Sequence, residues 1–296
     1  MSRALRAALG KLCRAQDDRL AGSQLSSAQR KALDAFARQT GSVQIQPRGR
    51  GVFYRIVQPA VVERHWRDLT PIDADELDAD LPKRAGNIAR ARFSKRSLHS
   101  HDLHYLLLKA AGPVQWRDGA GHRLDLDLAT VRQGAAVLAI DNDMRKDSGW
   151  HTAGTLWLVE NQALFDRLDW LPDRMHASVA YYGGQLRKGL IEWLAARPRA
   201  ARVRFFPDYD GVGLLNYARI KERLGDAVQL WLMPAWESRL RRYGNAELWQ
   251  GTAREFQAAQ RRLTELVLEP EVLELIRTMQ SLGMALEQEA VWVDTT

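Results

Sequence analysis

Two aspartates one residue apart, Asp208 and Asp210, follow an apolar run of the kind that forms a buried strand. A third acid, Glu160, stands in the same relation to an earlier apolar run at 155–159. Carboxylates at the mouth of a buried strand are costly to place unless a cation lies between them. A divalent metal ion is the simplest such cation, because Mg²⁺ prefers hard oxygen ligands. These three acids are therefore the first candidates for chemistry.

An alternation of strand and helix patterns begins near residue 154 and would position these acids. It is typical of a parallel sheet with crossover helices. The expected strands are 155–159, 177–182, 203–206 and 228–233. Ligand sites in parallel sheets collect at the carboxyl ends of the strands. Glu160, the Gly183-Gly184 pair and the two aspartates all follow strands, so we expect them at one edge of the sheet.

Each acid also has a purely structural interpretation. An aspartate at a strand-to-helix junction can be the N-cap of the next helix, and Asp210 alone fits that role. Asp141 and Asp143 repeat the aspartate spacing without the strand–helix–strand context, so we interpret them as a turn. Glu237, near the end of the fourth strand, is a candidate for a fourth acid.

Three segments, "LVENQALF", "YYGG" and "FFPDYDGVGL", make the sequence resemble a known family. They are similar to the C-terminal Toprim domain of the Wadjet nuclease family (MksG), which supplies the nuclease of SMC-like Wadjet and MksBEFG plasmid-defence systems. That family is itself related to the topoisomerase VI A subunit. The similarity covers about 150–240 and departs from the family pattern at Pro207 and Val212, neither of which is an acid.

The resemblance implies a Mg²⁺-dependent DNA endonuclease, with Mn²⁺ as a possible substitute, that hydrolyses phosphodiester bonds. Asp208 and Asp210 would hold metal. Glu160 would either ligate a second ion or act as general acid or base, and the sequence leaves both roles open. Three further residues would line the cofactor or phosphate: Asn161, Gly183 and Gly184.

The implied partners are double-stranded plasmid DNA, the subunits of an SMC-like ATPase complex and a second copy of the chain. Two other functions stay open. One is a non-catalytic DNA-binding or assembly subunit. The other is a topoisomerase VI A-like enzyme that cleaves through a tyrosine, for which Tyr54 and Tyr105 are the candidates.

The first 69 residues are expected to form a helical and winged-helix-like region. A helix with a capping box at Ser26 precedes two alternating segments that a glycine-arginine turn joins. In a winged helix this turn is a wing, and its Arg48 and Arg50 would contact DNA phosphates. An ordinary exposed hairpin is the alternative.

An acidic linker at 70–82 precedes a dense basic patch. The patch would contact a nucleic-acid backbone or pair with the acidic run before it. Its residues expected at DNA are Arg90, Arg92, Lys95 and Arg96.

The histidines His99, His101 and His104 lie close together, and a metal role for them is conceivable. The leucines around them favour a helix that simply packs. Residues 246–289 are expected to be helical with a break at Pro270, either packing back on the domain or forming a dimer contact.

Composition limits the remaining possibilities. The formal charge of +7 permits a polyanionic partner without proving one. The single cysteine, Cys13, excludes an internal disulfide and a cysteine-rich zinc site. We find neither an apolar run long enough to span a membrane nor a secretory signal, so we expect a cytoplasmic protein without a membrane partner.

We therefore expect an α/β fold in which a Toprim domain follows an α+β winged-helix-like region. The expected regions are 1–69 (helical and winged-helix-like), 70–150 (basic linker and small α+β region), 151–245 (Toprim domain) and 246–296 (helical extension).

Overall fold

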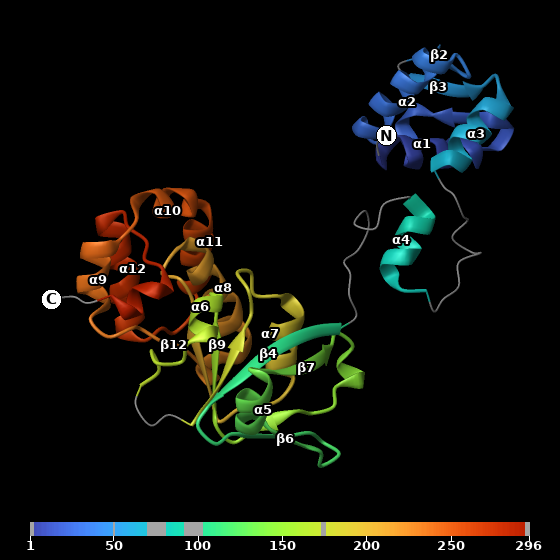
Figure 1. The fold of residues 1–296 in the computed structure, drawn as a ribbon. Coiled ribbons are helices and arrows are strands. Elements are labelled where there is room, and N and C mark those ends of the chain that lie inside the picture. The colour runs from blue at the N-terminus through green and yellow to red at the C-terminus, as the bar shows by residue number, and fades with distance from the viewer. Residues whose placement is uncertain (1–2, 50, 70–80, 92–102, 173–175, 294–296) are drawn as a thin grey trace. The chain divides into compact units, whose positions relative to one another are not determined.

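The structure is a computed structural model that describes residues 3–49, 51–69, 81–91, 103–172 and 176–293. The chain divides into two compact units, Met1–His101 and Asp102–Thr296 (Figure 1). Each unit has a hydrophobic core of its own.

The N-terminal unit combines helices with a small antiparallel sheet whose strand order is β1-β3-β2. Its strands are β1 (Arg19–Ala21), β2 (Val43–Arg48) and β3 (Gly51–Ile56). Its helices are α1 (Arg3–Cys13), α2 (Ser27–Thr40), α3 (Pro59–Leu69) and α4 (Lys83–Ala91), with short 3-10 turns at Gln16–Asp18 and Gly22–Gln24.

The expected helix and hairpin of this unit are confirmed. The Ser26 hydroxyl accepts a hydrogen bond from the Gln29 amide, and the Gln29 side chain accepts one from the Ser26 amide, which completes the capping box. Helix α2 ends at Gly41, whose φ of 63° is the left-handed value that favours glycine. The following residues form the β2–β3 hairpin, and Tyr54 of β3 is fully buried in the core.

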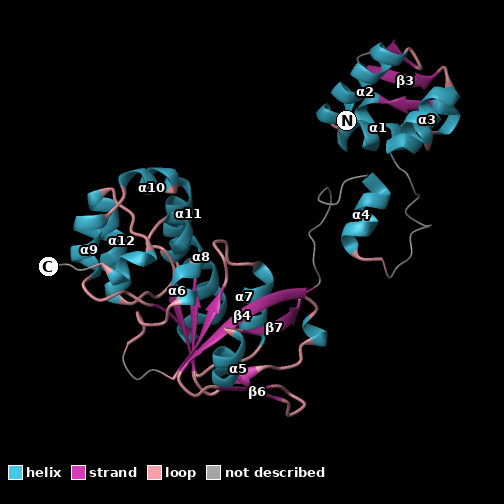
Figure 2. Ribbon diagram, in the orientation of Figure 1, coloured by secondary structure: helices cyan, strands magenta, loops and turns pink. Residues whose placement is uncertain are grey.

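The C-terminal unit is built on a six-stranded sheet of order β12-β11-β9-β10-β4-β7, drawn in magenta in Figure 2. The four predicted strands are β9 (Thr155–Val159), β10 (Ala177–Tyr181), β11 (Arg202–Phe206) and β12 (Val228–Leu230). They pair in parallel, as the alternation of strands and helices predicts. The crossover helices are α6 (Gln162–Asp166), α7 (Lys188–Ala196) and α8 (Gly211–Leu224). The α/β fold class is therefore confirmed.

The helix expected around His104 is wrong, because this segment is the strand β4 (Leu103–Ala111). It pairs antiparallel with β10 on one side and with β7 (Ala136–Asp141) on the other. Alternate residues such as Leu106 and Leu108 are fully buried, which is the period of a strand. The boundary expected at 150 therefore does not divide the fold, since residues 103–141 supply two strands of the same sheet.

A second, three-stranded sheet packs against the first through Trp116, whose indole donates a hydrogen bond to Ser178 of β10. It consists of β6 (Arg123–Asp125), β5 (Gln115–Arg117) and β8 (His151–Thr152), and α5 (Leu126–Gln133) follows β6. Beside it, Asp147 forms a buried ion pair with Arg199, at 2.8 Å, and its carboxylate is 3% exposed.

Four helices and a 3-10 helix complete the C-terminal unit: α9 (Trp236–Tyr243), α10 (Ala246–Gly251), α11 (Ala253–Leu263), α12 (Pro270–Leu282) and η6 (Gln288–Trp292). The four helices lie together beside α8, in orange and red in Figure 1. The helix expected to reach residue 289 ends at Leu282, because Gly283 adopts φ 64° and caps it. Pro270 begins this helix at its first turn, where a missing amide hydrogen costs nothing.

None of the helices in the described part of the chain is long and apolar enough to cross a membrane.

Candidate acidic site

Two neighbouring parallel strands deliver the three predicted acids to one edge of the sheet. Val159 of β9 is the register partner of Phe206 of β11, so the residues that follow the two strands leave the sheet side by side. Glu160 comes next on one strand, and Asp208 follows two residues after the end of the other. Glu160 and Asp210 are buried, at 8% and 6% exposed, and Asp208 is partly buried.

Glu160 holds its proton far more tightly than an ordinary glutamate. Burial and the nearby Asp208 carboxylate raise its pKa to about 8, although a hydrogen bond from Tyr182 favours the charged form. The Tyr182 hydroxyl donates to Oε2 of Glu160 at 3.0 Å. In the metal-free protein the carboxyl group is therefore largely protonated near neutral pH.

Asp208 lies in a similar environment. Burial and the neighbouring carboxylates raise its pKa to about 7, against the effect of a backbone hydrogen bond. Its Oδ1 accepts hydrogen bonds from the Asn161 side-chain amide at 3.0 Å and from the Gln288 backbone amide at 2.8 Å. The charged groups that act most strongly on Asp208 are all carboxylates, which is the condition that a bound cation would relieve.

Asp210 does serve as the N-cap of helix α8. Its Oδ1 accepts a hydrogen bond from the Gly213 amide at 2.7 Å. The capping alternative is therefore confirmed for this residue, but the same carboxylate also raises the pKa values of Glu160 and Asp208. The helix begins at Gly211, where a side chain would come within 2.0 Å of the Thr252 carbonyl oxygen.

The structure adds two acids that the sequence analysis missed, Glu287 and Glu289. Leu286 exchanges two backbone hydrogen bonds with Tyr209, and this bridge holds the C-terminal segment against the loop after β11. Both glutamates then raise the pKa of Asp208. The sequence contains a pattern that could have identified these two acids, because Glu287 and Glu289 are one residue apart, as Asp208 and Asp210 are.

The other residues predicted for the cofactor lie at the same edge. Asn161 donates from its side-chain amide to Asp208 and to Glu289, at 3.0 Å each. Gly183 and Gly184 follow β10 with φ values of 67° and 70°, a conformation that side chains disfavour. Asn216 of α8 donates to the Gly184 carbonyl oxygen at 3.2 Å and so fixes this turn against the helix.

The donor set fits a hard divalent ion in its chemistry. Glu160, Asp208 and Glu289 offer carboxylate oxygens, the ligands that Mg²⁺ prefers, and their repulsion raises the pKa of the first two. Within the described ranges, no three acidic, histidine or cysteine side chains are already arranged around one ion position. Metal binding would therefore require rotation of these side chains.

The other candidates of the sequence analysis have different structural settings or fall outside the described residues. Asp141 accepts a hydrogen bond from the Asp143 amide, and Asp143 pairs with Arg145 at 2.8 Å, which confirms the turn interpretation. Glu237 is exposed in the first turn of α9. His104 lies in β4, whereas His99 and His101 are outside the described residues.

The two candidate tyrosines differ in their surroundings. Tyr54 is fully buried and donates a hydrogen bond to Asp34 at 2.6 Å, which is the arrangement of a packing residue. Tyr105 lies in β4 and is 62% exposed.

Few of the predicted DNA contacts can be placed. Arg48 ends β2 and Arg90 lies in α4. The remaining four fall outside the described residues: Arg50, Arg92, Lys95 and Arg96.

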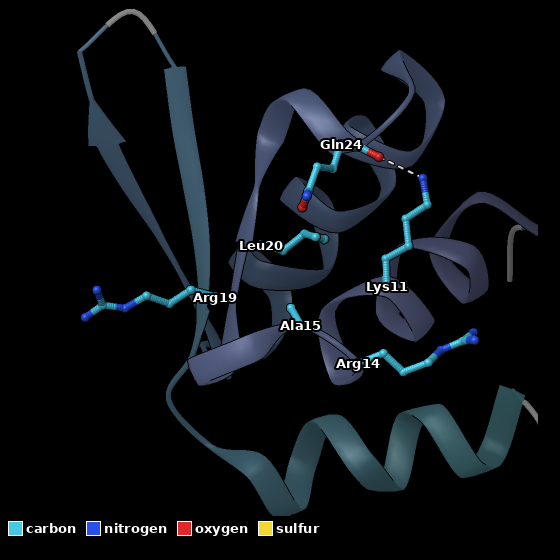
Figure 3. Close-up of a pocket in the computed structure, with 6 residues that line it drawn as sticks. All are labelled: Lys11, Arg14, Ala15, Arg19, Leu20 and Gln24. Carbon is cyan, nitrogen blue, oxygen red and sulfur yellow. Dashed lines mark hydrogen bonds between the residues drawn. The ribbon is translucent and has the colours of Figure 1, made fainter.

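The N-terminal unit also contains a basic hollow of about 750 Å³, shown in Figure 3. Lys11 donates to the Gln24 carbonyl oxygen at 2.7 Å and to the Gln29 side chain, so neither partner carries a negative charge. Arg14 and Arg19 extend to opposite sides of the hollow (Figure 3). Arg19 is also the cross-strand partner of Arg55 on β3.

Comparison with known proteins gives a family but no activity. A search of the curated proteins found no match. A family model described as a domain of unknown function, DUF7281, matches residues 121–295. The match spans more than half of the chain and includes all the acids of the site. The chain therefore belongs to the DUF7281 family.

Proposed function

We propose that the protein is a metal-dependent DNA endonuclease that hydrolyses phosphodiester bonds. The observation that carries the proposal is a pair of carboxyl groups, the buried Glu160 and the partly buried Asp208, at the ends of adjacent parallel strands. Burial and the repulsion of neighbouring carboxylates raise their pKa values to about 8 and about 7. Perturbed acids at the carboxyl edge of a parallel sheet are frequent in active sites.

Each residue of the site would have a distinct role in this reaction. Mg²⁺ or Mn²⁺ would neutralise charge on the phosphate and increase the acidity of water when bound. Asp208 and Asp210 would hold the ion. Glu160 can hold or release a proton near neutral pH, since Tyr182 orients its Oε2. The Gly183-Gly184 turn would let the phosphate approach the backbone closely.

The wider biological role rests on the resemblance to the Wadjet nuclease family (MksG). On this basis the protein would act as a cytoplasmic effector of an SMC-like plasmid-defence complex, and as a homodimer. Its C-terminal unit would be a Toprim domain, and the α2–hairpin arrangement would be a winged helix. Copurification of the protein with an SMC-like ATPase from its native cells would test this part of the proposal separately.

Nicking of supercoiled plasmid with Mg²⁺ tests the chemistry. We expect Glu160→Gln and Asp208→Asn to lower the rate by about 100-fold or more, the usual cost of removing a group that stabilises a transition state. Asp143→Asn is the matched control, because Asp141 and Asp143 repeat the spacing of the two site aspartates, and the partly exposed Asp143 pairs with Arg145. Wild-type rates for both site variants would refute the proposal.

Charge segregation favours a second candidate, a non-catalytic DNA-binding or assembly subunit. Residues 1–69 contain 13 basic and 5 acidic residues, a formal charge of +8. Residues 102–296 contain 24 basic and 26 acidic residues, a formal charge of −2. A basic N-terminal unit alone suffices to bind a polyanion. This candidate predicts DNA binding that falls steeply with salt and does not change in Asp208→Asn.

A further inference from the structure

The C-terminal segment reaches the acidic site through a polar residue that is itself buried. Gln288 is fully buried, and its side chain joins the two strand ends that carry the acids. Its Oε1 accepts a hydrogen bond from the Asn161 backbone amide at 2.9 Å, and its amide group donates to the Phe206 carbonyl oxygen. A buried glutamine that satisfies both loops fixes their separation.

The same segment fixes Asp208 directly. The Gln288 backbone amide donates to Oδ1 of Asp208, and the Leu286–Tyr209 bridge lies immediately beside it. Residues on either side of Gln288 are therefore held at defined positions next to Asp208. Of the two flanking glutamates, Glu289 is partly buried and Glu287 is exposed.

The side-chain amide nitrogen of Asn161 connects Glu289 to Asp208. It lies 3.0 Å from Oδ1 of Asp208 and 3.0 Å from Oε2 of Glu289, so these two oxygens are no more than 6.0 Å apart. Two ligands of one Mg²⁺ ion lie up to about 4.2 Å apart, given bonds of about 2.1 Å. A small rotation of either carboxylate, with displacement of the Asn161 amide, would allow both to bind one ion.

We propose that Glu289 is a further metal-binding residue and that Gln288 is the positioning residue that holds it at the site. This inference rests on the proposed function and concerns a divalent cation. On this inference residues 286–289 are part of the metal site and do more than pack against the domain. The Asn161 side-chain amide donates to both carboxylates in the metal-free protein, and it would release both when they bind the ion.

The affinity for Mn²⁺ alone, measured by electron paramagnetic resonance, tests the inference without an activity assay. We expect Glu289→Gln to weaken Mn²⁺ binding at least tenfold relative to the wild type. Glutamine keeps an oxygen for the Asn161 hydrogen bond and removes a charge that repels Asp208, so the metal-free variant should be at least as stable as the wild type in thermal unfolding. Glu289→Asp, which keeps the charge, should bind Mn²⁺ more tightly than Glu289→Gln. Glu265→Gln, in the exposed turn after α11, is the matched control.

The outcomes separate this inference from the proposed function. If Asp208→Asn loses Mn²⁺ binding while Glu289→Gln stays within twofold of the wild type, Glu289 is not a ligand and only the present inference fails. If the wild type itself does not bind Mn²⁺, the proposed function fails with it. A Gln288→Ala variant should weaken Mn²⁺ binding as well, and unchanged affinity in that variant would remove its positioning role.

Discussion

Replacing Glu160 by glutamine should stabilise the metal-free protein in alkaline solution. The folded protein raises the pKa of this carboxyl group from 4.5 to about 8, so it binds more protons than the unfolded chain between these values. The free energy of unfolding must then fall as pH rises through that window. Glutamine has no proton to lose, and it retains an oxygen that can accept the Tyr182 hydrogen bond.

The size of the effect follows from the shift. One pKa unit corresponds to about 1.4 kcal/mol, which gives an upper limit of about 5 kcal/mol above pH 8. Glu160 and Asp208 are close enough to titrate as a coupled pair, so the shift does not belong to Glu160 alone and we expect a gain of about 2–3 kcal/mol. For a unit of this size the gain corresponds to a rise of about 5–10 °C in Tm.

Thermal unfolding at pH 5 and pH 9 in the presence of a chelator measures this difference. The variant and the wild type should unfold at nearly the same temperature at pH 5, and the variant should be more stable at pH 9. Adding Mg²⁺ at pH 9 should stabilise the wild type more than the variant. Glu265→Gln keeps Glu160, so its unfolding temperature should follow that of the wild type at both pH values. Equal stability of Glu160→Gln and the wild type at pH 9 would show that the reasoning about burial and repulsion is wrong.

Two predictions concern the framework of the C-terminal unit. Arg199→Met would remove the buried cation that pairs with the buried Asp147 carboxylate and leave it an ion pair with Arg197, whose side chain is half exposed. Urea unfolding should therefore reveal a loss of about 3–5 kcal/mol, and a loss below about 1 kcal/mol would contradict the role of the ion pair. Gly211→Ala would place a methyl group 2.0 Å from the Thr252 carbonyl oxygen and 2.6 Å from the Phe256 amide nitrogen. This clash should lower the free energy of unfolding by at least about 1–3 kcal/mol in the same assay. The control is Gly251→Ala, whose methyl group meets no atom within 4 Å and which should be neutral or slightly stabilising.

The sequence predicts the sheet edge well because local patterns define it. The strands before Glu160 and Asp208 are short and end in buried apolar residues, and helices separate them. In this arrangement the order of elements alone puts both acids at the same edge. Even the N-cap role of Asp210 can be anticipated from its position before a helix.

The parts that the sequence did not predict depend on contacts between distant residues. The leucine-rich run of β4 has no periodicity that separates a strand from a helix, and pairing with β10 and β7 determines the outcome. Glu289 was missed for the same reason. Its position depends on Gln288 and on the Leu286–Tyr209 bridge, and no local pattern in residues 283–289 indicates either contact.

The Gln288 contacts have a consequence for synthesis of the protein. They join residues 80 and 127 positions apart in the chain, to Asp208 and to Asn161. A nascent chain on the ribosome can complete the sheet while residues 286–289 are still inside the exit tunnel. Translation would therefore deliver the sheet first and the assembled acid cluster only after these residues have emerged. A ribosome-bound chain stalled before residue 286 should fold its strands and lack the divalent-ion binding that we propose for the released protein.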